Sequence, residues 1–367
     1  MKRYNEMEQD MSKTSEILKR VAAKRQKRAE PVWSGPESDA PNGGITYSML
    51  SRFLVCRERF RLMVVEGLKP ADAFNARMEF GNMWHVCEEN HAKVVEEQKQ
   101  TGEVKVGYLP PLRDYCAQLG RKYPLQREQI QHWFDVTQAL FPVYAHHWSR
   151  HPDVKDRTPL LQEQVFHVPY KLPSGRTVWL RGKWDAVDLI GKGKAAGVYI
   201  QENKTKSSID GQKIARQLSF DLQTMLYLTA LESWPRHFAD KPILGVRYNV
   251  IRRSAHKSVE SMMKKVHEDR DAGRIGEWFA RWNVPITPAD VAKFRQQCLD
   301  PILEQLCDWW QFWLGNEMYK NRNLHWRHPF GVWNVLDEGG SSDLDAYLES
   351  GSEAGLQRTD QLFPELQ

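Results

Sequence analysis

Two short segments of the chain place acidic and basic side chains at spacings that suit metal-assisted hydrolysis. Asp185 follows the strand-like run 177–180, and Glu202 follows a second such run, 198–200, with Lys204 two residues later. Because strand side chains alternate between faces, Glu202 and Lys204 point the same way. Carboxylates from neighbouring strands can hold a hard cation such as Mg²⁺, and a lysine beside them can orient the attacking water and offset phosphate charge. These residues therefore predict hydrolysis of a phosphodiester.

Four short patterns follow one another along the chain and extend this prediction. Each consists of two residues at a fixed spacing, and the pairs are Gly81 and His85, Gly182 and Asp185, Glu202 and Lys204, and Gln223 and Tyr227. Gln223 and Tyr227 are four residues apart, so they share one face if their segment is helical. An isolated E-x-K triplet means little, because charged residues make up 27% of the chain. The prediction therefore depends on the order of all four patterns.

This order resembles the PD-(D/E)XK nuclease superfamily, and specifically its RecB-like branch, which includes phage exonucleases. The branch has G-x-x-x-H, G-x-x-D, (D/E)-x-K and Q-x-x-x-Y in the same order, and the resemblance covers roughly residues 45–335. It implies an α/β fold with a mixed central sheet flanked by helices, which is the restriction-endonuclease-like core, with helical insertions. It also implies a Mg²⁺ or Mn²⁺ ion held by His85, Asp185, Glu202 and the backbone carbonyl of Asn203.

The same resemblance implies catalytic roles for further residues. Lys204 would position the attacking water or help to deprotonate it, and Gln223 and Tyr227 would orient the active-site strands or contact the DNA backbone. Candidate phosphate contacts are the polar and basic side chains near the ends of the strands, namely Thr205, Lys206, Arg252 and Arg281. Such contacts position nucleic acid without reading its sequence.

Most of these assignments have a plainer alternative. Glu202 and Lys204 could form a surface ion pair, which contributes little to stability. His85 could be a buried, hydrogen-bonded histidine, and Asp185 could cap a turn. Gln223 and Tyr227 could pack a helix. Glu88 and Glu89, on the same predicted helix as His85, are expected to be solvated, with a role beside the metal as the alternative.

Cysteine positions bear on the cofactor. Some nucleases of this branch bind an iron–sulfur cluster through one early and three late cysteines. Cys56 stands at the early position, but the late region 321–333 contains no cysteine, and Cys298 and Cys307 lie upstream of it. We therefore expect no iron–sulfur cluster. The five cysteines include no C-x-x-C pair, which is typical of reduced thiols in a cytosolic protein.

Periodicity predicts the elements that must position the site. Helices are expected near 46–60, 79–97, 218–231 and 288–313, and a mainly helical stretch is expected after residue 97, with its apolar residues between 133 and 148. Strands are expected near 164–168, 178–190, 198–204 and 245–251. Residues 1–44 are predicted to be a basic, disordered arm with a Pro- and Gly-rich linker, 45–338 the nuclease domain, and 339–367 an acidic, disordered tail.

These observations favour a metal-dependent DNA exonuclease for recombination or DNA processing. A catalytically silent DNA-binding or assembly protein and a structure-specific or RNA endonuclease remain the alternatives. The net charge of +5 is compatible with DNA as the partner, and a recombination or single-strand-annealing protein could be a second one. No apolar run reaches the length of a membrane helix, so a cytoplasmic protein, bacterial or phage-encoded, is expected.

Overall fold

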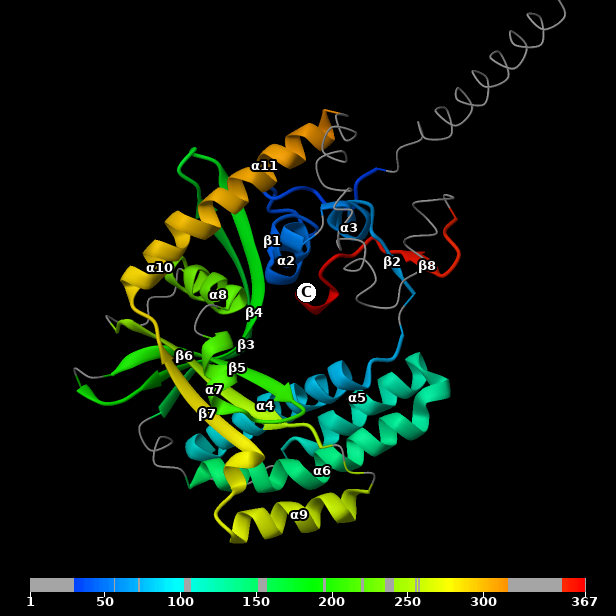
Figure 1. The fold of residues 1–367 in the computed structure, drawn as a ribbon, viewed down its shortest axis with the longest axis vertical. Coiled ribbons are helices and arrows are strands. Elements are labelled where there is room, and N and C mark those ends of the chain that lie inside the picture. Colours follow the sequence, from blue (N-terminus) through cyan, green and yellow to red (C-terminus); the bar gives the residue numbers. More distant parts are fainter. Residues whose placement is uncertain are drawn as a thin grey trace, which may run out of the picture.

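A six-stranded mixed sheet lies at the centre of the fold (Figure 1). The computed structural model describes residues 30–315 and 352–366, with gaps at 56, 72, 102–106, 151–156, 194–195, 219–220, 235–240, 255 and 257. The strand order is β1 (Ile45–Thr46), β4 (Thr177–Ile190), β5 (Gly197–Lys206), β6 (Ile243–Arg252) and β7 (Phe279–Pro285), and β3 (Arg157–Lys171) also pairs with β4. The β1–β4 and β5–β6 pairs are parallel, and the other pairs are antiparallel.

Helices cover both faces of this sheet (Figure 1). One side holds α2 (Tyr47–Val55), α8 (Leu222–Glu232), α10 (Pro288–Phe294) and α11 (Asp300–Leu314). The other side holds α4 (Ala76–Thr101), α5 (Leu109–Lys122), α6 (Arg127–Ser149) and α9 (Val259–Asp271). Shorter elements complete the described chain: α3 (Arg57–Phe60), β2 (Leu68–Pro70), α7 (Gly211–Leu218), β8 (Leu356–Arg358), π-helical turns at Arg61–Val65 and Arg295–Leu299, and 3-10 turns at Pro124–Gln126, Ile275–Glu277 and Pro364–Leu366.

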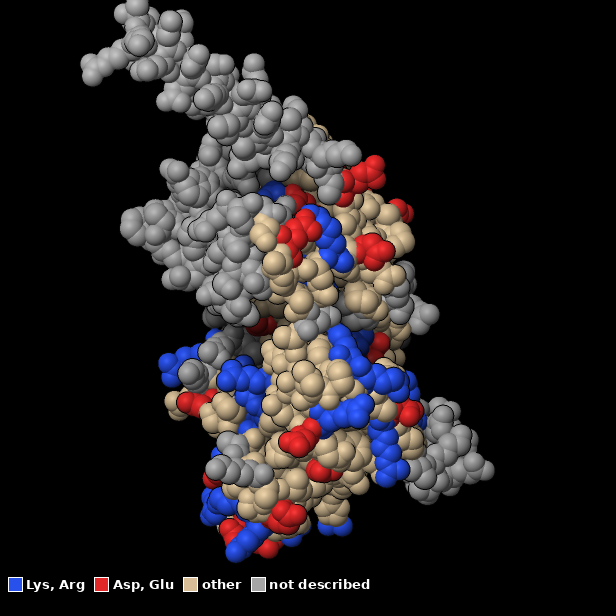
Figure 2. All heavy atoms as spheres, turned by 90° about the vertical axis from the view of Figure 1, so that its right-hand side faces the viewer, with Lys and Arg blue, Asp and Glu red and all other residues tan. Residues whose placement is uncertain are grey.

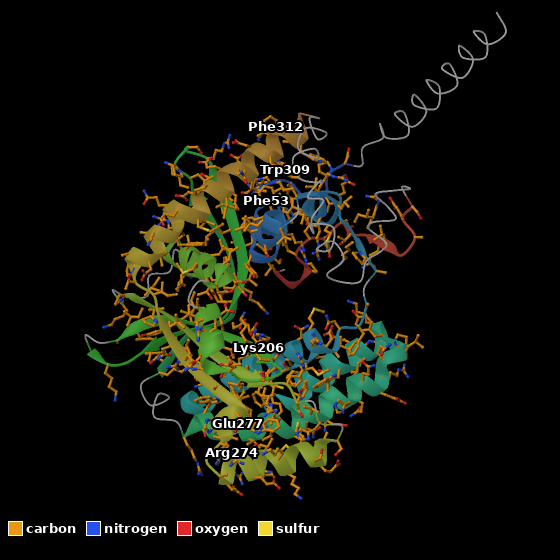
Figure 3. All side chains as sticks on the ribbon, in the orientation of Figure 1. Phe53, Lys206, Arg274, Glu277, Trp309 and Phe312 are labelled. Atoms are coloured by element: carbon orange, nitrogen blue, oxygen red, sulfur yellow. The ribbon has the colours of Figure 1, made fainter. Side chains whose placement is uncertain are left out.

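Two hydrophobic cores hold the layers together. The alternation of β5 sends Val198 and Ile200 into the core under α8 and α11, where Phe53 and Trp309 also meet with ring centroids 5.8 Å apart (Figure 3). The second core lies between α4, α6, α9 and the opposite side of the sheet, and includes Trp84. Because each core packs helices against one face, the sheet lies between two layers of helices, as in other α/β folds.

The start of α8 is determined by its cap. Asp221 precedes the helix in an extended conformation, and its Oδ2 accepts hydrogen bonds from the backbone N–H and the hydroxyl of Thr224. An aspartate in this position satisfies N–H groups that the first turn of a helix leaves unpaired. The cap fixes where the helix begins, and with it the positions of Gln223 and Tyr227 at the sheet.

The predicted fold class is confirmed, but several elements were not predicted. A mixed sheet with helices on both faces is present, and the predicted strands lie within β3, β4, β5 and β6. The strand β7, the two-residue β1 and helix α9 were missed, and the helical stretch expected after residue 97 is divided into α5 and α6. β7 contains Arg281 and Asn283, polar residues that make its sequence resemble a basic surface segment. Their pairing partners on β6 make this segment a strand.

The predicted linker before residue 45 is not a flexible segment where the structure describes it. Trp33 is fully buried, and its indole Nε1 donates a hydrogen bond to the Gly44 carbonyl at 2.8 Å. The Arg181 guanidinium donates to three backbone carbonyls of residues 39–41. The turn-rich composition correctly indicated loops, but burial of one tryptophan and satisfied backbone groups hold these loops on the body.

The predicted disorder of the acidic tail is likewise wrong for residues 352–366. β8 pairs with β2 in an antiparallel two-stranded sheet, and Phe363 is buried with the Arg181 guanidinium 5.2 Å from its ring centroid. This aromatic anchor and the strand pairing outweigh the polar composition of the segment. Residues 1–29 and 316–351, which contain the rest of the predicted arm and tail, lie outside the described residues.

Charge is unevenly distributed over one face of the molecule. Figure 2 shows Lys and Arg side chains gathered on the lower half of this face, with Asp and Glu side chains among them. Among the described helices, none combines the length and apolar composition that a membrane crossing requires.

Candidate active site

The strands β4 and β5 pair only along part of their length. Their register runs from Ile190 opposite Gly197 to Ala186 opposite Gln201, and the described pairing stops there. Asp185 is the next residue of β4, and its Oδ2 accepts a hydrogen bond from the backbone N–H of Asn203 at 2.7 Å. The Asp185 carboxylate therefore takes the place of the next backbone hydrogen bond between β4 and β5. It lies at the point where the two strands separate, which we call the fork.

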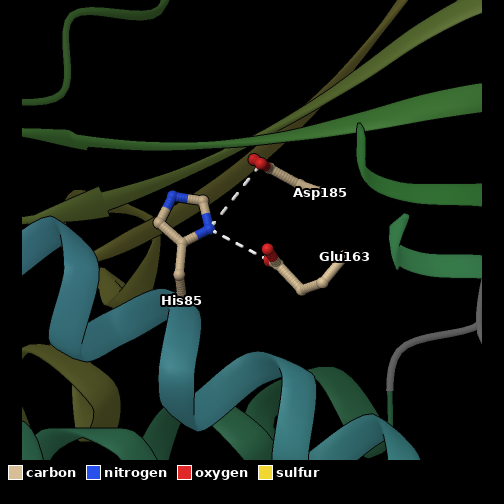
Figure 4. Close-up of side chains that lie close together, drawn as sticks. All are labelled: His85, Glu163 and Asp185. Atoms are coloured by element: carbon tan, nitrogen blue, oxygen red, sulfur yellow. Dashed lines mark hydrogen bonds and ion pairs between the residues drawn. The ribbon is translucent and has the colours of Figure 1, made fainter. Parts of the chain in front are cut away.

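Three side chains from three elements meet beside this fork (Figure 4). His85 of α4 has its Nδ1 at 3.7 Å from Asp185 Oδ1 and at 3.3 Å from Oε1 of Glu163, a residue of β3. The potential ligand atoms of His85, Glu163 and Asp185 lie within 4.8 Å of one another. An imidazole nitrogen with two carboxylates is a donor set that suits a divalent cation.

Glu163 was not predicted from the sequence. It directly precedes the strand-like run 164–168 and belongs to none of the four patterns. Its backbone has φ of 44°, the only positive φ among the described non-glycine residues, and the β3–β4 register passes from Gln162 to Gln164 around it. A left-handed conformation costs on the order of 1–3 kcal/mol and is concentrated at functional sites. Here it accompanies a carboxylate that is only 6% exposed and pairs with Lys183 Nζ at 2.5 Å.

The two carboxylates determine the protonation of His85. Burial by itself lowers the pKa of the imidazole, but Asp185 and Glu163 outweigh it and raise the pKa to about 9. In the absence of a cation, an imidazolium therefore balances these two negative charges. A metal ligand must be deprotonated, so a divalent cation would have to displace this proton.

A second chain of contacts starts at Glu202. Lys204 Nζ donates to Glu202 Oε2 at 2.8 Å and to Gln223 Oε1 at 3.0 Å, and Tyr227 is hydrogen-bonded to the Gln223 side chain. Glu202 is 1% exposed, and its Oε1 has no hydrogen-bond partner among the described residues. A buried carboxylate oxygen without a partner is costly, and a bound cation would satisfy it. Glu202 is nevertheless not part of the compact group formed by His85, Glu163 and Asp185. The sequence predicted Glu202 as a ligand beside His85 and Asp185, and in the structure Glu163 holds that position.

Electrostatics keep Lys204 charged. Burial disfavours the ammonium, but the Glu202 and Asp185 carboxylates together raise the pKa of Lys204 above its usual value. Burial, assisted by the negative charge of Asp185, raises the pKa of Glu202, and the ammonium opposes this effect. Lys204 is consequently a hydrogen-bond donor and a positive charge at the site. This state favours the predicted role in positioning water over the role in removing its proton.

The glycine of the G-x-x-D pattern has a packing explanation. A Cβ at Gly182 would lie 2.5 Å from the Phe166 ring and 3.1 Å from the Tyr227 ring. The missing side chain lets both rings approach the strand, where they form an edge-to-face pair with centroids 5.3 Å apart. Gly182 therefore brings Tyr227, and with it α8, close to β4.

Asn203 joins the site to a buried polar network behind β5. Its Oδ1 accepts from Asn249 Nδ2 at 2.8 Å, and Asn249 also donates to the Tyr144 hydroxyl and to Glu88. Glu88 is thus half-buried in this network and not a solvated helix position. A ligand role for the Asn203 backbone carbonyl stays a prediction. The hydrogen bonds of its side chain hold Asn203 in a fixed position at the site.

Arg281 and Arg252, two of the predicted phosphate contacts, have other partners. Arg281 donates to Asn249 Oδ1 at 3.3 Å and stacks on the Trp148 ring at 3.9 Å, and Arg252 lies over the Trp278 ring and 4.0 Å from Glu277. These contacts favour structural roles for both. Thr205 lines a pocket beside Lys204, and Lys206 ends β5 (Figure 3).

The absence of an iron–sulfur cluster stays a prediction. Cys56 and residues 321–333 lie outside the described residues. Cys87, Cys116, Cys298 and Cys307 are free cysteines.

The sheet, the fork and the acidic cluster define the class of protein: an α/β protein with a restriction-endonuclease-like core and a site suited to a divalent metal. The sequence pattern of the PD-(D/E)XK nuclease superfamily matches residues 45–309, and the chain belongs to this superfamily of metal-dependent phosphodiesterases. The resemblance seen in the sequence is confirmed at the level of the superfamily. A comparison with curated proteins found no match.

Glu163 provides a test of the cluster. Because its carboxylate faces His85 next to Asp185, Glu163→Gln should raise the Mg²⁺ concentration needed for half-maximal cleavage by about tenfold or more. Titration of cleavage with Mg²⁺, together with Mn²⁺ binding to the purified protein, would measure this change. Glu260→Gln is the matched control, since Glu260 is exposed in the first turn of α9. Equal Mg²⁺ requirements for the two variants would remove Glu163 from the metal site.

Proposed function

We propose that this protein is a Mg²⁺- or Mn²⁺-dependent nuclease that hydrolyses DNA, and that it acts as an exonuclease in recombination or DNA processing. The observation that supports this most is the position of Asp185. Its two oxygens join the His85–Glu163 cluster to the backbone of the strand that carries Glu202 and Lys204. A cation-binding group and a fixed ammonium therefore lie at one fork of the sheet.

The donor set fits a cation that the superfamily implies. His85, Glu163 and Asp185 would hold it, and the unpartnered Oε1 of Glu202 offers a further oxygen. When bound, such an ion lowers the pKa of water and screens the charge of the phosphate. Lys183 would balance the charge on Glu163 from the opposite side, since the two form an ion pair.

Lys204 would act on the phosphate through its ammonium protons. Glu202 and Gln223 hold Nζ in place by two hydrogen bonds, and the remaining N–H can donate to the attacking water or to a phosphate oxygen. A donor fixed before the reaction stabilises developing negative charge without reorganising. Gln223 and Tyr227 are then positioning residues, because they act through Lys204.

The exonuclease assignment rests on the resemblance to the RecB-like branch, and a cleavage assay tests it. Linear and closed-circular DNA are incubated with Mg²⁺, with Mn²⁺ or with EDTA. Metal-dependent loss of linear DNA alone is the expected result. Cutting of the circle would make the protein an endonuclease, and cleavage of RNA or branched DNA alone would change the substrate. Binding of DNA without cleavage would favour an assembly protein.

A further inference from the structure

A pocket of about 230 Å³ opens beside the candidate active site. Its wall includes Arg77, Met78 and Gly81 of α4 and Thr205 of β5, and it reaches His85 and Lys204 at the site itself. A group bound in this pocket would therefore lie directly next to a phosphate held at the fork.

Gly81 keeps this pocket open. A Cβ at this position would meet only the Thr205 hydroxyl, at 3.7 Å, which is an ordinary van der Waals contact. Its backbone is helical, so neither close packing nor an unusual φ requires a glycine here. Glycine inside a helix is destabilising relative to alanine. A glycine without a structural reason, in the wall of a pocket beside the site, indicates that space is needed there.

The mouth of the pocket is basic and partly apolar. Arg77 is exposed, and Met78 has 52% of its surface exposed. Burial, followed by the charge of Arg77, lowers the pKa of Arg253, so both guanidinium groups add positive charge to this region. The backbone N–H of Arg253 donates to the Lys206 carbonyl at 2.7 Å, which places Arg253 at the end of β5. An exposed guanidinium in the wall of a pocket is suited to a phosphate, which it can bind through two parallel N–H donors.

We propose that this pocket binds the nucleotide that flanks the scissile phosphate. Arg77 contacts the phosphate on its outer side, Met78 packs against the sugar or base, and Gly81 leaves room for them. Methionine adapts to different apolar surfaces, so this contact accepts any base. This inference extends the proposed nuclease function. It rests on that function for the conclusion that the bound nucleotide belongs to DNA.

The test fills the pocket and measures binding without cleavage. Gly81→Leu places a side chain in the pocket, and Gly120→Leu is the matched control, because Gly120 also lies in a helix and a Cβ there would meet no neighbouring group within 4 Å. The probe is a short fluorescein-labelled single-stranded DNA, with Ca²⁺ in place of Mg²⁺ and fluorescence anisotropy as the readout. We expect Gly81→Leu to raise the Kd by about tenfold or more relative to Gly120→Leu. Mn²⁺ binding should be equal in the two variants.

A second pair of variants tests the phosphate contact. Arg77→Ala should also raise the Kd by about tenfold and reduce its dependence on salt, whereas Arg113→Ala, at an exposed position of α5, should match the unmodified protein. Thermal melting shows that each variant is folded. Equal Kd values for Gly81→Leu and Gly120→Leu, both folded, would overturn the inference. If the protein binds the probe in this way but cleaves no DNA with Mg²⁺, the pocket stands and the nuclease function fails.

Discussion

Lys204→Ala should reduce kcat for DNA cleavage by about a hundredfold to a thousandfold, the usual cost of losing one donor to a transition state. The structural reason is that Lys204 Nζ is held by Glu202 and Gln223 and remains charged beside the cluster of His85, Glu163 and Asp185. The measurement is single-turnover cleavage of linear DNA at saturating Mg²⁺. DNA binding in Ca²⁺ should change much less, because one ammonium contributes little to the total contact with DNA.

The interpretation of this variant depends on Glu202. Removing the ammonium leaves a buried carboxylate without its charged partner, so its proton affinity increases and metal binding could also weaken. Lys204→Gln is therefore the sharper variant, since its amide can still donate one hydrogen bond to Glu202. Lys93→Ala, which removes an exposed lysine of α4, is the control. Wild-type rates in both Lys204 variants would exclude Lys204 from catalysis.

Asp185→Asn should abolish metal-dependent cleavage, with a loss on the order of a thousandfold or more. Asparagine has the same shape and can still accept the hydrogen bond from the Asn203 backbone through its single oxygen. Its NH₂ group must then point towards His85, where the carboxylate oxygen would meet the cation. The variant should therefore fold, bind DNA in the absence of metal, and show little binding of Mn²⁺.

Asp188→Asn is the informative control for this experiment. Asp188 lies three residues further along β4, is fully buried, and forms an ion pair with Arg157 at 2.8 Å. Neutralising it leaves the half-buried guanidinium of Arg157 with a weaker partner, so the main effect should be a lower melting temperature. Retained cleavage in Asp185→Asn would mean that the reaction occurs elsewhere. Equal loss of Mn²⁺ binding in both variants would indicate a general distortion of β4.

Sequence patterns were most informative where chemistry depends on local spacing. Glu202 and Lys204 share a face because of strand alternation, and Gln223 and Tyr227 share a face because they are four residues apart on α8. The superfamily followed from the order of such pairs and is confirmed. The wrong expectations came from composition: the Gly- and Pro-rich segment before residue 45 has the composition of a linker, although it contains the buried Trp33.

Glu163 shows why the remaining part of the site could not be predicted from the sequence. It belongs to β3, and it meets His85 only because β3 pairs with β4 and the backbone turns to a positive φ at this residue. Neither event has a local sequence signal. Arg281 is the opposite case, because its charge predicted a phosphate contact, while β7 places it against Trp148 and Asn249.

The sequence by itself determined the superfamily, the α/β class and the residues whose types are needed for the chemistry. These properties depend on residue identity and on spacing within single strands or helices. Only the tertiary structure decided that Glu163 joins His85 and Asp185, that Lys204 also reaches Gln223 of α8, and that an open pocket lies beside Gly81. The reason is physical: these features arise from strand register and from helices packed across the sheet, which bring together residues far apart in the chain.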